Sequence, residues 1–448
     1  MAGLIPLLIA LTIVETAAHS GRALTDPRTI LVWLALLSGI WWLSCETVAR
    51  ILCIRATRSE SITHRLLMRW DVLAQTLVIG LFAWLCYGLG WSHQAGYYSL
   101  ALAPWVMLQG IHWWCLALPM RTISGVPWTR WSYLSHHVRF ALLPLAVALP
   151  ILDVSAWIGN HSFLKSTWLF THHMDEVNLA GGLLLALALV GLLPWILVRL
   201  WGAKPLPAGP MHDELAAACS RTGVRVTAIL HWPIQGGRMY NAMVMGVLPK
   251  MRYVLFTDDL LRDFPREERL AVLGHELGHA RYRHLWIYLL FALVTMLASW
   301  MVRAPLEQWL DLWTKQLPAS IQIDPDLRSG LVALILLGIQ WRILFGWLSR
   351  LCERQADLAG ADLAGDGNPQ QGASAMQAAL RDVARLAGVD PNSPSWRHHS
   401  ITERVRFLAL SEVNPLLVQH HHQLVQRTVI ALVMLTLGLI AGATLYHT

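Results

Sequence analysis

The chain contains several apolar runs long enough to cross a lipid bilayer, and this feature excludes most soluble folds. A helical span needs about 20 apolar residues, and only 14% of the 448 residues are charged, against roughly 25% in a soluble domain. The sequence therefore predicts a mostly α-helical, polytopic membrane protein. The runs that approach or reach the required length are 3–18, 30–48, 71–90, 98–118, 137–152, 179–200, 285–302, 329–349 and 427–446.

The first and fifth runs are short, so an interfacial or re-entrant segment is an open alternative for both. The first run also has features of a cleaved signal peptide, because residues 4–14 are apolar and Ala17 and Ala18 are small. However, no Lys or Arg precedes it, and signal peptides normally carry one. We favour a retained first helix. The six cysteines include no Cys-x-x-Cys pair, which disfavours a disulfide framework or a thiolate zinc site.

Basic residues predict the orientation of the spans. Arginines crowd the loops after the second and fourth runs, whereas the alternate loops are neutral or lean acidic, so the positive-inside rule places the arginine-rich loops in the cytoplasm. The formal net charge of +7 mostly marks orientation, and nucleic acid is not an expected partner. The loop arginines are Arg50, Arg55, Arg58, Arg65, Arg69, Arg121, Arg130 and Arg139.

Counting through the spans predicts five regions of the chain. Residues 1–202 form an N-terminal transmembrane region of about six spans, and 285–349 form a transmembrane hairpin. Residues 203–284 and 350–426 lie in one compartment, the cytoplasm, and form the two parts of a single domain. Residues 427–448 form a C-terminal transmembrane helix.

The first part of this domain has an α+β pattern. Residues 211–222 read as an amphipathic helix that Gly223 caps. Three β-like runs follow, at 224–230, 238–247 and 252–257. They predict a small mixed or antiparallel sheet.

A second helix is expected to begin at Pro265, since Pro is favoured in the first turn and Glu267 and Glu268 lie near the positive end of the dipole. It is expected to run through His275 and His279 and into the span at residue 285. In the second part of the domain, loops at 365–369 and 388–395 flank a helix at 370–387.

The predicted second helix carries the sequence His275-Glu276-Leu277-Gly278-His279. Positions i and i+4 share one helix face, so both imidazoles can reach one metal ion. Two His ligands leave room for a third ligand and a water, and the Glu between them can take the proton of that water. A five-residue match can also arise by chance, so the motif needs independent support.

A pair of carboxylates on the same predicted membrane side supplies that support. Glu353 and Asp357 begin the second part of the domain and are also spaced i, i+4. One carboxylate can bind the metal, and the other can accept the outer N–H of a ligating His. Taken alone, this segment would read as a solvated helix face of mixed charge.

Together, His275-Glu276-x-x-His279 and Glu353-x-x-Ala356-Asp357 resemble the family-48 metallopeptidases. These are membrane zinc proteases that include the HtpX and CAAX prenyl proteases. The resemblance covers roughly residues 211–410. It implies a gluzincin-type α+β zinc-protease domain facing the cytoplasm, with one Zn²⁺ per chain bound by His275, His279 and Glu353, and with Glu276 as general base.

Lesser matches extend the resemblance. Asn241 opens a β-like run similar to the substrate-facing edge strand of the family, and residues 398–405 resemble a late His-Pro-x-x-x-x-Arg motif in which His399 replaces the Pro. The resemblance implies that Asn241 contacts the substrate and that His398 or Arg404 hydrogen-bonds the developing oxyanion. A turn residue at 241, a structural His and an ion-paired Arg are the alternatives.

The expected function is therefore a membrane-bound zinc metalloendopeptidase of a bacterial inner membrane. Its substrates would be membrane-tethered chains or membrane proteins, cut at the cytoplasmic surface of the bilayer. A sensor-type metalloprotease that cuts one signalling protein is an alternative, as is a non-catalytic zinc-binding scaffold, which the intact Glu276 disfavours. The pairs at 136–137 and 172–173 and the triplet at 420–422 are interpreted as solvated loop histidines, not as a transport path.

Overall fold

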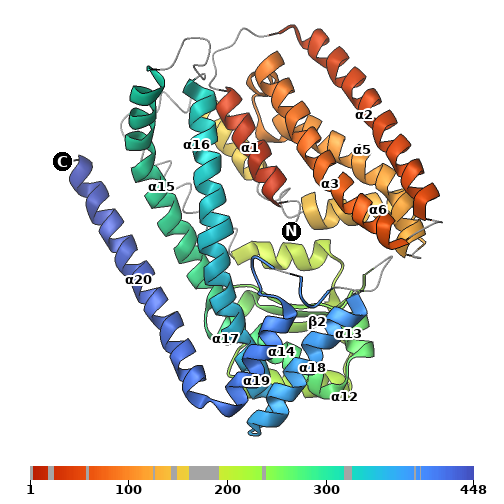
Figure 1. The fold of residues 1–448 in the computed structure, drawn as a ribbon, viewed down its shortest axis with the longest axis vertical. Coiled ribbons are helices and arrows are strands. Elements are labelled where there is room, and N and C mark those ends of the chain that lie inside the picture. Colours follow the sequence, from red (N-terminus) through yellow and green to blue (C-terminus); the bar gives the residue numbers. More distant parts are fainter. Residues whose placement is uncertain are drawn as a thin grey trace. The chain divides into compact units, whose positions relative to one another are not determined.

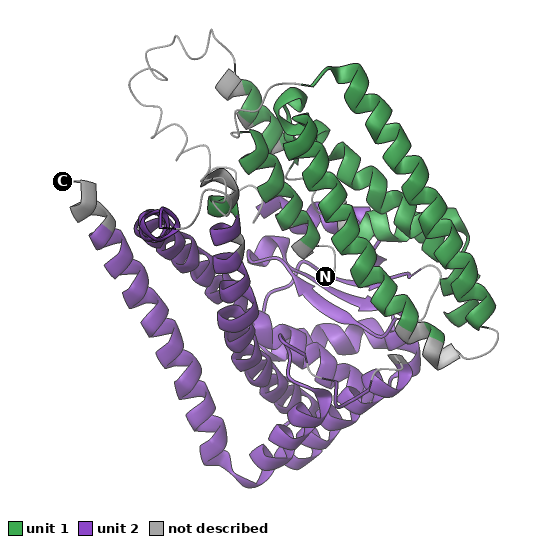
Figure 2. Ribbon diagram, turned by 45° about the horizontal axis from the view of Figure 1, so that its top comes forward, with its two compact units in different colours: residues 1–189, 235–237, 324–330 green, residues 190–234, 238–323, 331–448 purple. Residues whose placement is uncertain are grey.

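The computed structural model (Figure 1) divides into two compact units (Figure 2). One comprises residues 1–189 with two short additional segments, and the other comprises residues 190–234, 238–323 and 331–448. The residues described are 4–18, 25–56, 60–124, 127–142, 149–160, 191–234, 239–316, 325–387, 390–393 and 395–447.

The first unit is built from helices. Three of them, α2, α3 and α5, pack around buried aromatic residues, among them Trp41, Phe82 and Trp105. The outward side chains of α2 are strongly apolar and more than half exposed, for example Ile40 and Leu43, as expected of a surface that faces lipid. The helices are α1 (Leu4–Ala18), α2 (Pro27–Ala56), α3 (Glu60–Ala83), α4 (Trp91–Ala95), α5 (Tyr98–Ser124), α6 (Arg130–His137) and α8 (Leu149–Asn160), with π-helical turns at Trp84–Gly88 and Val138–Leu142.

Charged groups buried in the first unit are paired. Glu46 of α2 accepts hydrogen bonds from Arg50 at 3.1 Å and from Arg130 at 2.8 Å.

The interpretation of His136 and His137 as solvated loop residues is wrong, because both lie on α6 among aromatic rings. The ring of His137 stacks on Trp113 at 5.0 Å between centroids.

Within the described residues, six helices are long and apolar enough to cross a membrane. They overlap six of the predicted runs, and the multi-pass membrane character is confirmed. The six are Pro27–Ala56, Leu66–Gly88, Tyr98–Ile123, His284–Thr314, Arg328–Gly365 and Pro415–Gly442.

The other three predicted runs do not form such helices within the described residues. The run at 3–18 forms α1, whose 15 residues fall short of a full span. The run at 137–152 is divided, because the π-helical turn ends at Leu142, α8 starts at Leu149 and the residues between them lie outside the described part. The run at 179–200 lies mostly outside it too, and Gly191–Leu200 forms a short apolar helix.

The second unit contains a four-stranded mixed sheet in the order β1-β2-β4-β3. Strand β2 (Ala228–Trp232) pairs in parallel with β4 (Tyr253–Thr257), and β3 (Ala242–Met245) pairs antiparallel with β4 and forms one edge. The mixed sheet agrees with expectation, although β3 is shorter than the predicted run 238–247. Strand β1 (Lys204–Pro205), at the other edge, was not predicted.

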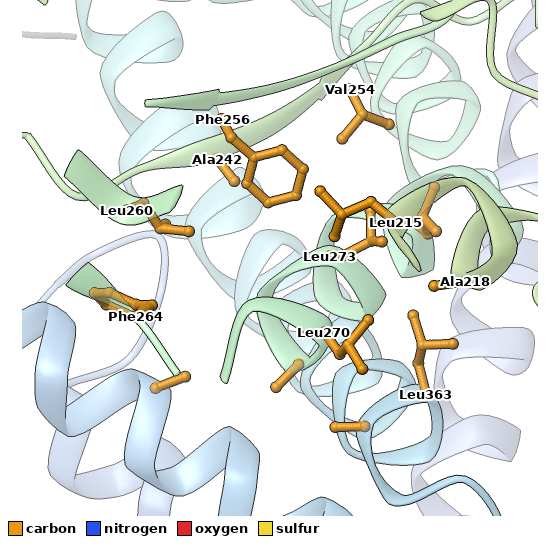
Figure 3. Close-up of a cluster of buried hydrophobic side chains, with 14 of the residues drawn as sticks. Leu215, Ala218, Ala242, Val254, Phe256, Leu260, Phe264, Leu270, Leu273 and Leu363 are labelled. Atoms are coloured by element: carbon orange, nitrogen blue, oxygen red, sulfur yellow. The ribbon is translucent and has the colours of Figure 1, made fainter. Parts of the chain in front are cut away.

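Helices from both halves of the second unit share one hydrophobic core (Figure 3). Leu215 of α12, Phe256 of β4 and Leu273 of α14 meet Leu363 of α17 and Leu380 of α18 there. Gly223 follows α12 with a φ of 70°, as a helix-capping glycine should. The helices are α12 (Pro210–Arg221), α13 (Asp258–Asp263), α14 (Arg266–Arg281), α17 (Gly346–Gly365), α18 (Pro369–Ala387) and α19 (Ile401–Val413), with a 3₁₀ turn at Pro249–Met251.

Three long apolar helices belong to this unit, except for residues 325–330 at the start of the second helix, which are assigned to the first unit. They are α15 (His284–Thr314), the helix formed by α16 (Pro325–Ile339), a π-helical turn (Gln340–Phe345) and α17, and α20 (Pro415–His447). Helix α14 does not continue into α15 as the sequence predicted. It ends at Arg281, and Arg283 adopts a left-handed φ of 57° before α15 begins.

Helices α14 and α17 cross at backbone contact, because small residues line the crossing. A Cβ atom added to Gly274 would lie 2.9 Å from the carbonyl oxygen of Ala359, and one added to Gly360 would lie 2.6 Å from that of Ala271. These distances are shorter than real Cβ contacts, so only glycine fits at both positions.

We predict that Gly360→Ala lowers stability, although replacing a helical Gly by Ala normally stabilises a helix by about 0.5–1 kcal/mol. The new methyl group forces α14 and α17 apart, and overpacking of this kind costs ~1–3 kcal/mol. Gly438→Ala on α20 is the matched control, since a Cβ there meets nothing within 4 Å. Thermal unfolding of the detergent-solubilised protein measures both, and equal midpoints for the two variants would contradict the prediction.

Candidate active site

The structure brings His275, His279 and Glu353 together, two from α14 and one from α17. Their ligand atoms all lie within 4.8 Å of one another. The Nε2 atoms of the two histidines are 3.3 Å apart, and they lie 3.6 and 3.7 Å from the carboxylate oxygens of Glu353. Two imidazole nitrogens and a carboxylate oxygen form a donor set that suits Zn²⁺. The residues present therefore fit a zinc ion.

Asp357 lies one helical turn beyond Glu353 and contacts the opposite side of His275. Its Oδ1 lies 2.9 Å from Nδ1 of His275, so the imidazole donates there and its Nε2 is left to face the metal position. The Arg404 guanidinium donates two hydrogen bonds to the Asp357 carboxylate, at 2.9 and 2.5 Å. All of these groups are largely buried, and Asp357 is fully buried.

The geometry directs Arg404 to a different contact from the one the resemblance implied. The guanidinium is engaged by Asp357 and lies 3.9 Å from Glu353. Its contacts are those of the ion-paired alternative, in which it orients the Asp357 carboxylate.

Glu276 lies between the two histidines and contacts the edge of the sheet. The backbone N–H of Val244 in β3 donates to its Oε2 at 3.0 Å. Burial raises the pKa of Glu276 to about 7, which suits a group that must accept and release a proton near neutral pH. Burial also lowers the pKa of His279 to about 3, which keeps this imidazole in the neutral form that binds metals.

The outward-facing backbone of β3 follows from its register. Asn241 accepts a hydrogen bond from the Thr257 N–H, and Met243 and Met245 continue the bonded positions opposite β4. In an antiparallel pair such positions alternate with non-bonded ones, so Ala242 and Val244 point their backbone groups out of the edge. The strand edge therefore presents outward main-chain groups beside Glu276, and one of them, the Val244 N–H, is bonded to the Glu276 carboxylate. Asn241 itself precedes this edge and pairs through its backbone with Thr257.

His398 lies at the rim of the metal position. Its Nδ1 is 3.0 Å from Oε1 of Glu353, and its side chain is 40% exposed. Trp396, two residues before His398, anchors the loop, because its carbonyl accepts a hydrogen bond from Arg350 on α17. His399 has a φ of 50°, which Pro cannot adopt, so the loop conformation here explains the departure from the family motif.

Three residues that no sequence motif indicated form a chain of contacts that begins at His279. Nδ1 of His279 lies 2.9 Å from Nδ1 of His284, whose Nε2 lies 2.9 Å from Oε1 of Gln355. The Gln355 amide nitrogen is 2.7 Å from Nδ1 of His422. The triplet at 420–422 is therefore not a solvated loop. It lies on α20, and His421 is buried and bonds the Leu351 carbonyl. The pair at 172–173 lies outside the described residues.

We predict that Arg404→Gln destabilises the protein by ~3–5 kcal/mol, because it leaves the Asp357 charge buried without its partner. Arg406→Gln is the matched control, on the same helix but exposed. Denaturant unfolding in detergent measures both. Adding Asp357→Asn to Arg404→Gln should cost less than the sum of the single changes, and strict additivity would show that the two groups are not coupled.

Comparison with known proteins adds independent evidence. The model of peptidase family M48 matches residues 215–436. The HtpX protease homologue of Syntrophotalea carbinolica is 27% identical over 41% of this chain and 62% of its own length, and that of Pyrobaculum calidifontis is 28% identical over 49% and 60%. The chain thus spans about 60% of the length of these relatives. A CAAX prenyl protease 1 homologue of Dictyostelium discoideum is 26% identical over 35% of each chain.

The fold has a solved counterpart. The crystal structure of S. mikatae Ste24p aligns with a TM-score of 0.50 at 16% identity, covering 86% of this chain and 99% of that one. This likeness concerns the fold alone. The family match spans both α14 and α17, the helices that carry the three candidate ligands. The chain therefore contains a domain of peptidase family M48.

Proposed function

We propose that the protein is a zinc metalloendopeptidase that hydrolyses peptide bonds of membrane-associated polypeptides at the cytoplasmic surface of a bacterial inner membrane. The observation that carries the proposal is the convergence of His275, His279 and Glu353 beside Glu276. A purely structural zinc site has no use for a general base and usually closes its fourth position with another protein ligand.

The residues of the chain divide the chemistry between them. Zinc held by His275, His279 and Glu353 would supply a Lewis acid that polarises the peptide carbonyl and acidifies a water. The Glu276 carboxylate takes the proton of the attacking water and then passes it to the leaving amine. His398, at the rim, donates a hydrogen bond to the oxyanion that develops on the carbonyl oxygen.

The edge of β3 supports a polypeptide as substrate. Its outward main-chain groups at Ala242 and Val244 lie beside the general base. An extended peptide can add to such an edge as a further strand, with bonds that depend little on its sequence. In this proposal Asn241 stands where the added strand would enter.

The ends of two membrane helices support a membrane-associated substrate. His284, the first residue of α15, follows His279 after five positions, and Glu353 follows the end of the apolar run 329–349 on its own helix after four. The metal position is therefore close to where these spans end. Substrates that reach it most readily are tethered chains and the loops or tails of membrane proteins. The arginine-rich loops support the cytoplasm as their compartment.

We predict that Glu276→Gln abolishes cleavage but leaves about one zinc bound per chain, because it removes the proton acceptor and keeps all three ligands. General-base catalysis contributes roughly 10²–10⁴-fold, so the residual rate should fall by at least ~100-fold. Glu267→Gln on the same helix is the control. Detergent-purified protein is assayed for bound zinc and for cleavage of unfolded casein.

The outcome separates the rival functions. If the wild type and Glu267→Gln cleave casein and Glu276→Gln does not, the endopeptidase is supported. If the wild type binds zinc but does not cleave casein, a protease specific for one signalling protein is favoured. If the protein binds zinc and Glu276→Gln leaves its function in cells unchanged, a non-catalytic scaffold is favoured. Absence of zinc from the wild type contradicts the site.

We predict that Ala242→Pro lowers kcat/KM for an unfolded substrate by about tenfold, the effect expected when one backbone donor is lost. The β4 ladder is kept, because the Ala242 N–H points out of the edge, and the bond from Val244 to Glu276 is left in place. Ala242→Gly retains the N–H and serves as the control. Unchanged kinetics in the proline variant would contradict strand addition at this edge.

A further inference from the structure

The two histidine ligands have different outer partners. His275 donates to a carboxylate, that of Asp357, whereas Nδ1 of His279 faces the neutral ring of His284 at 2.9 Å. His284 is fully buried and uses both ring nitrogens, because its Nε2 lies 2.9 Å from the amide oxygen of Gln355. A buried imidazole bonded at both nitrogens holds one tautomer.

The orientation of the Gln355 amide decides the proton on each ring. Its nitrogen donates to Nδ1 of His422, so its oxygen must accept from Nε2–H of His284. Nδ1 of His284 is then an acceptor and receives the Nδ1–H of His279. The Nε2 lone pair of His279 is left to face His275 and Glu353. The opposite polarity would put a proton on the nitrogen that must bind the metal.

The backbone is strained at the residue that brings His284 into place. Arg283 has a φ of 57°, a left-handed conformation that is unfavourable for a residue other than glycine. Strain of this kind persists where the surrounding contacts require it. Here the left-handed residue turns the first residue of α15 back toward His279.

The chain of hydrogen bonds from His279 through His284 and Gln355 ends at His422, which is more exposed than the two residues before it. His422 is half-buried and lines a cavity of about 420 Å³ together with Tyr282 and Glu412. Water in that cavity can replace an acceptor lost at His422. No such replacement is open to His284 or Gln355, which are 0% and 5% exposed.

We propose that His284 and Gln355 are positioning residues for the metal, which hold His279 in the tautomer and ring orientation that present Nε2 to the ion. This inference rests on the zinc site of the proposed function. Outer partners of this kind contribute about 10–100-fold to metal affinity. The effect should therefore be large at His284 and Gln355 and small at His422.

The test measures zinc affinity, by competition with a chelating indicator, for the full-length protein in detergent. His284→Leu and Gln355→Leu are expected to bind zinc about 10–100-fold more weakly than the wild type. His284→Asn and Gln355→Glu, which keep an acceptor oxygen, should recover most of the loss. His422→Ala should stay within about threefold. The absorption spectrum of the Co²⁺-loaded protein should change in the leucine variants and return in the conservative ones.

Each result has a defined meaning. Leucine variants that bind zinc as tightly as the wild type overturn the inference while the zinc site stands. Equal losses in the leucine and conservative variants assign the effect to packing and also overturn it. A wild type that binds no zinc removes the proposed function itself. Unfolding midpoints in excess chelator identify a leucine variant that fails to fold. In that case the zinc affinities of the leucine and conservative variants at the other position decide the test.

Discussion

The close crossing of α14 and α17 is the constraint on which the rest of the site depends. Helices with ordinary side chains at their contact lie 8–10 Å apart, and the glycines at 274, 278 and 360 remove the side chains that would hold these two at that distance. The two histidines on one helix then reach the carboxylate on the other. Zinc ligation tolerates deviations of only about 0.2 Å, so a crossing widened by one methyl group would place Glu353 out of reach.

The charges at this crossing are unbalanced without a cation. Glu276, Glu353 and Asp357 face the same small volume, where the Arg404 guanidinium is hydrogen-bonded to Asp357 and lies 3.9 Å from Glu353. Buried charge of one sign is costly unless it is compensated. A divalent ion between Glu353 and the two neutral imidazoles would compensate it. The same ion would favour the ionised form of Glu276, which is the form that accepts a proton.

Local periodicity explains what could be predicted from the sequence. The pairs His275/His279 and Glu353/Asp357 are each one helical turn apart, so their shared faces follow from the helix itself, and six spans follow from length and apolarity. The partner of Arg404 and the contact of Val244 with Glu276 could not be foreseen, because each depends on how distant segments pack. His137 and His421 were misread for the same reason, since local sequence does not reveal the aromatic rings or carbonyl that they contact.

The break at Arg283 shows most clearly why a continuous pattern can mislead. In an unbroken helix, residues five positions apart point about 140° away from each other, so His284 would face away from His279. The left-handed residue restarts the helix and reverses this. It also allows the axes of α14 and α15 to point in different directions. This is needed because α15 must cross the bilayer, whereas α14 must lie against α17 at backbone contact. A single straight helix would satisfy only one of them, and the strain at one residue allows both.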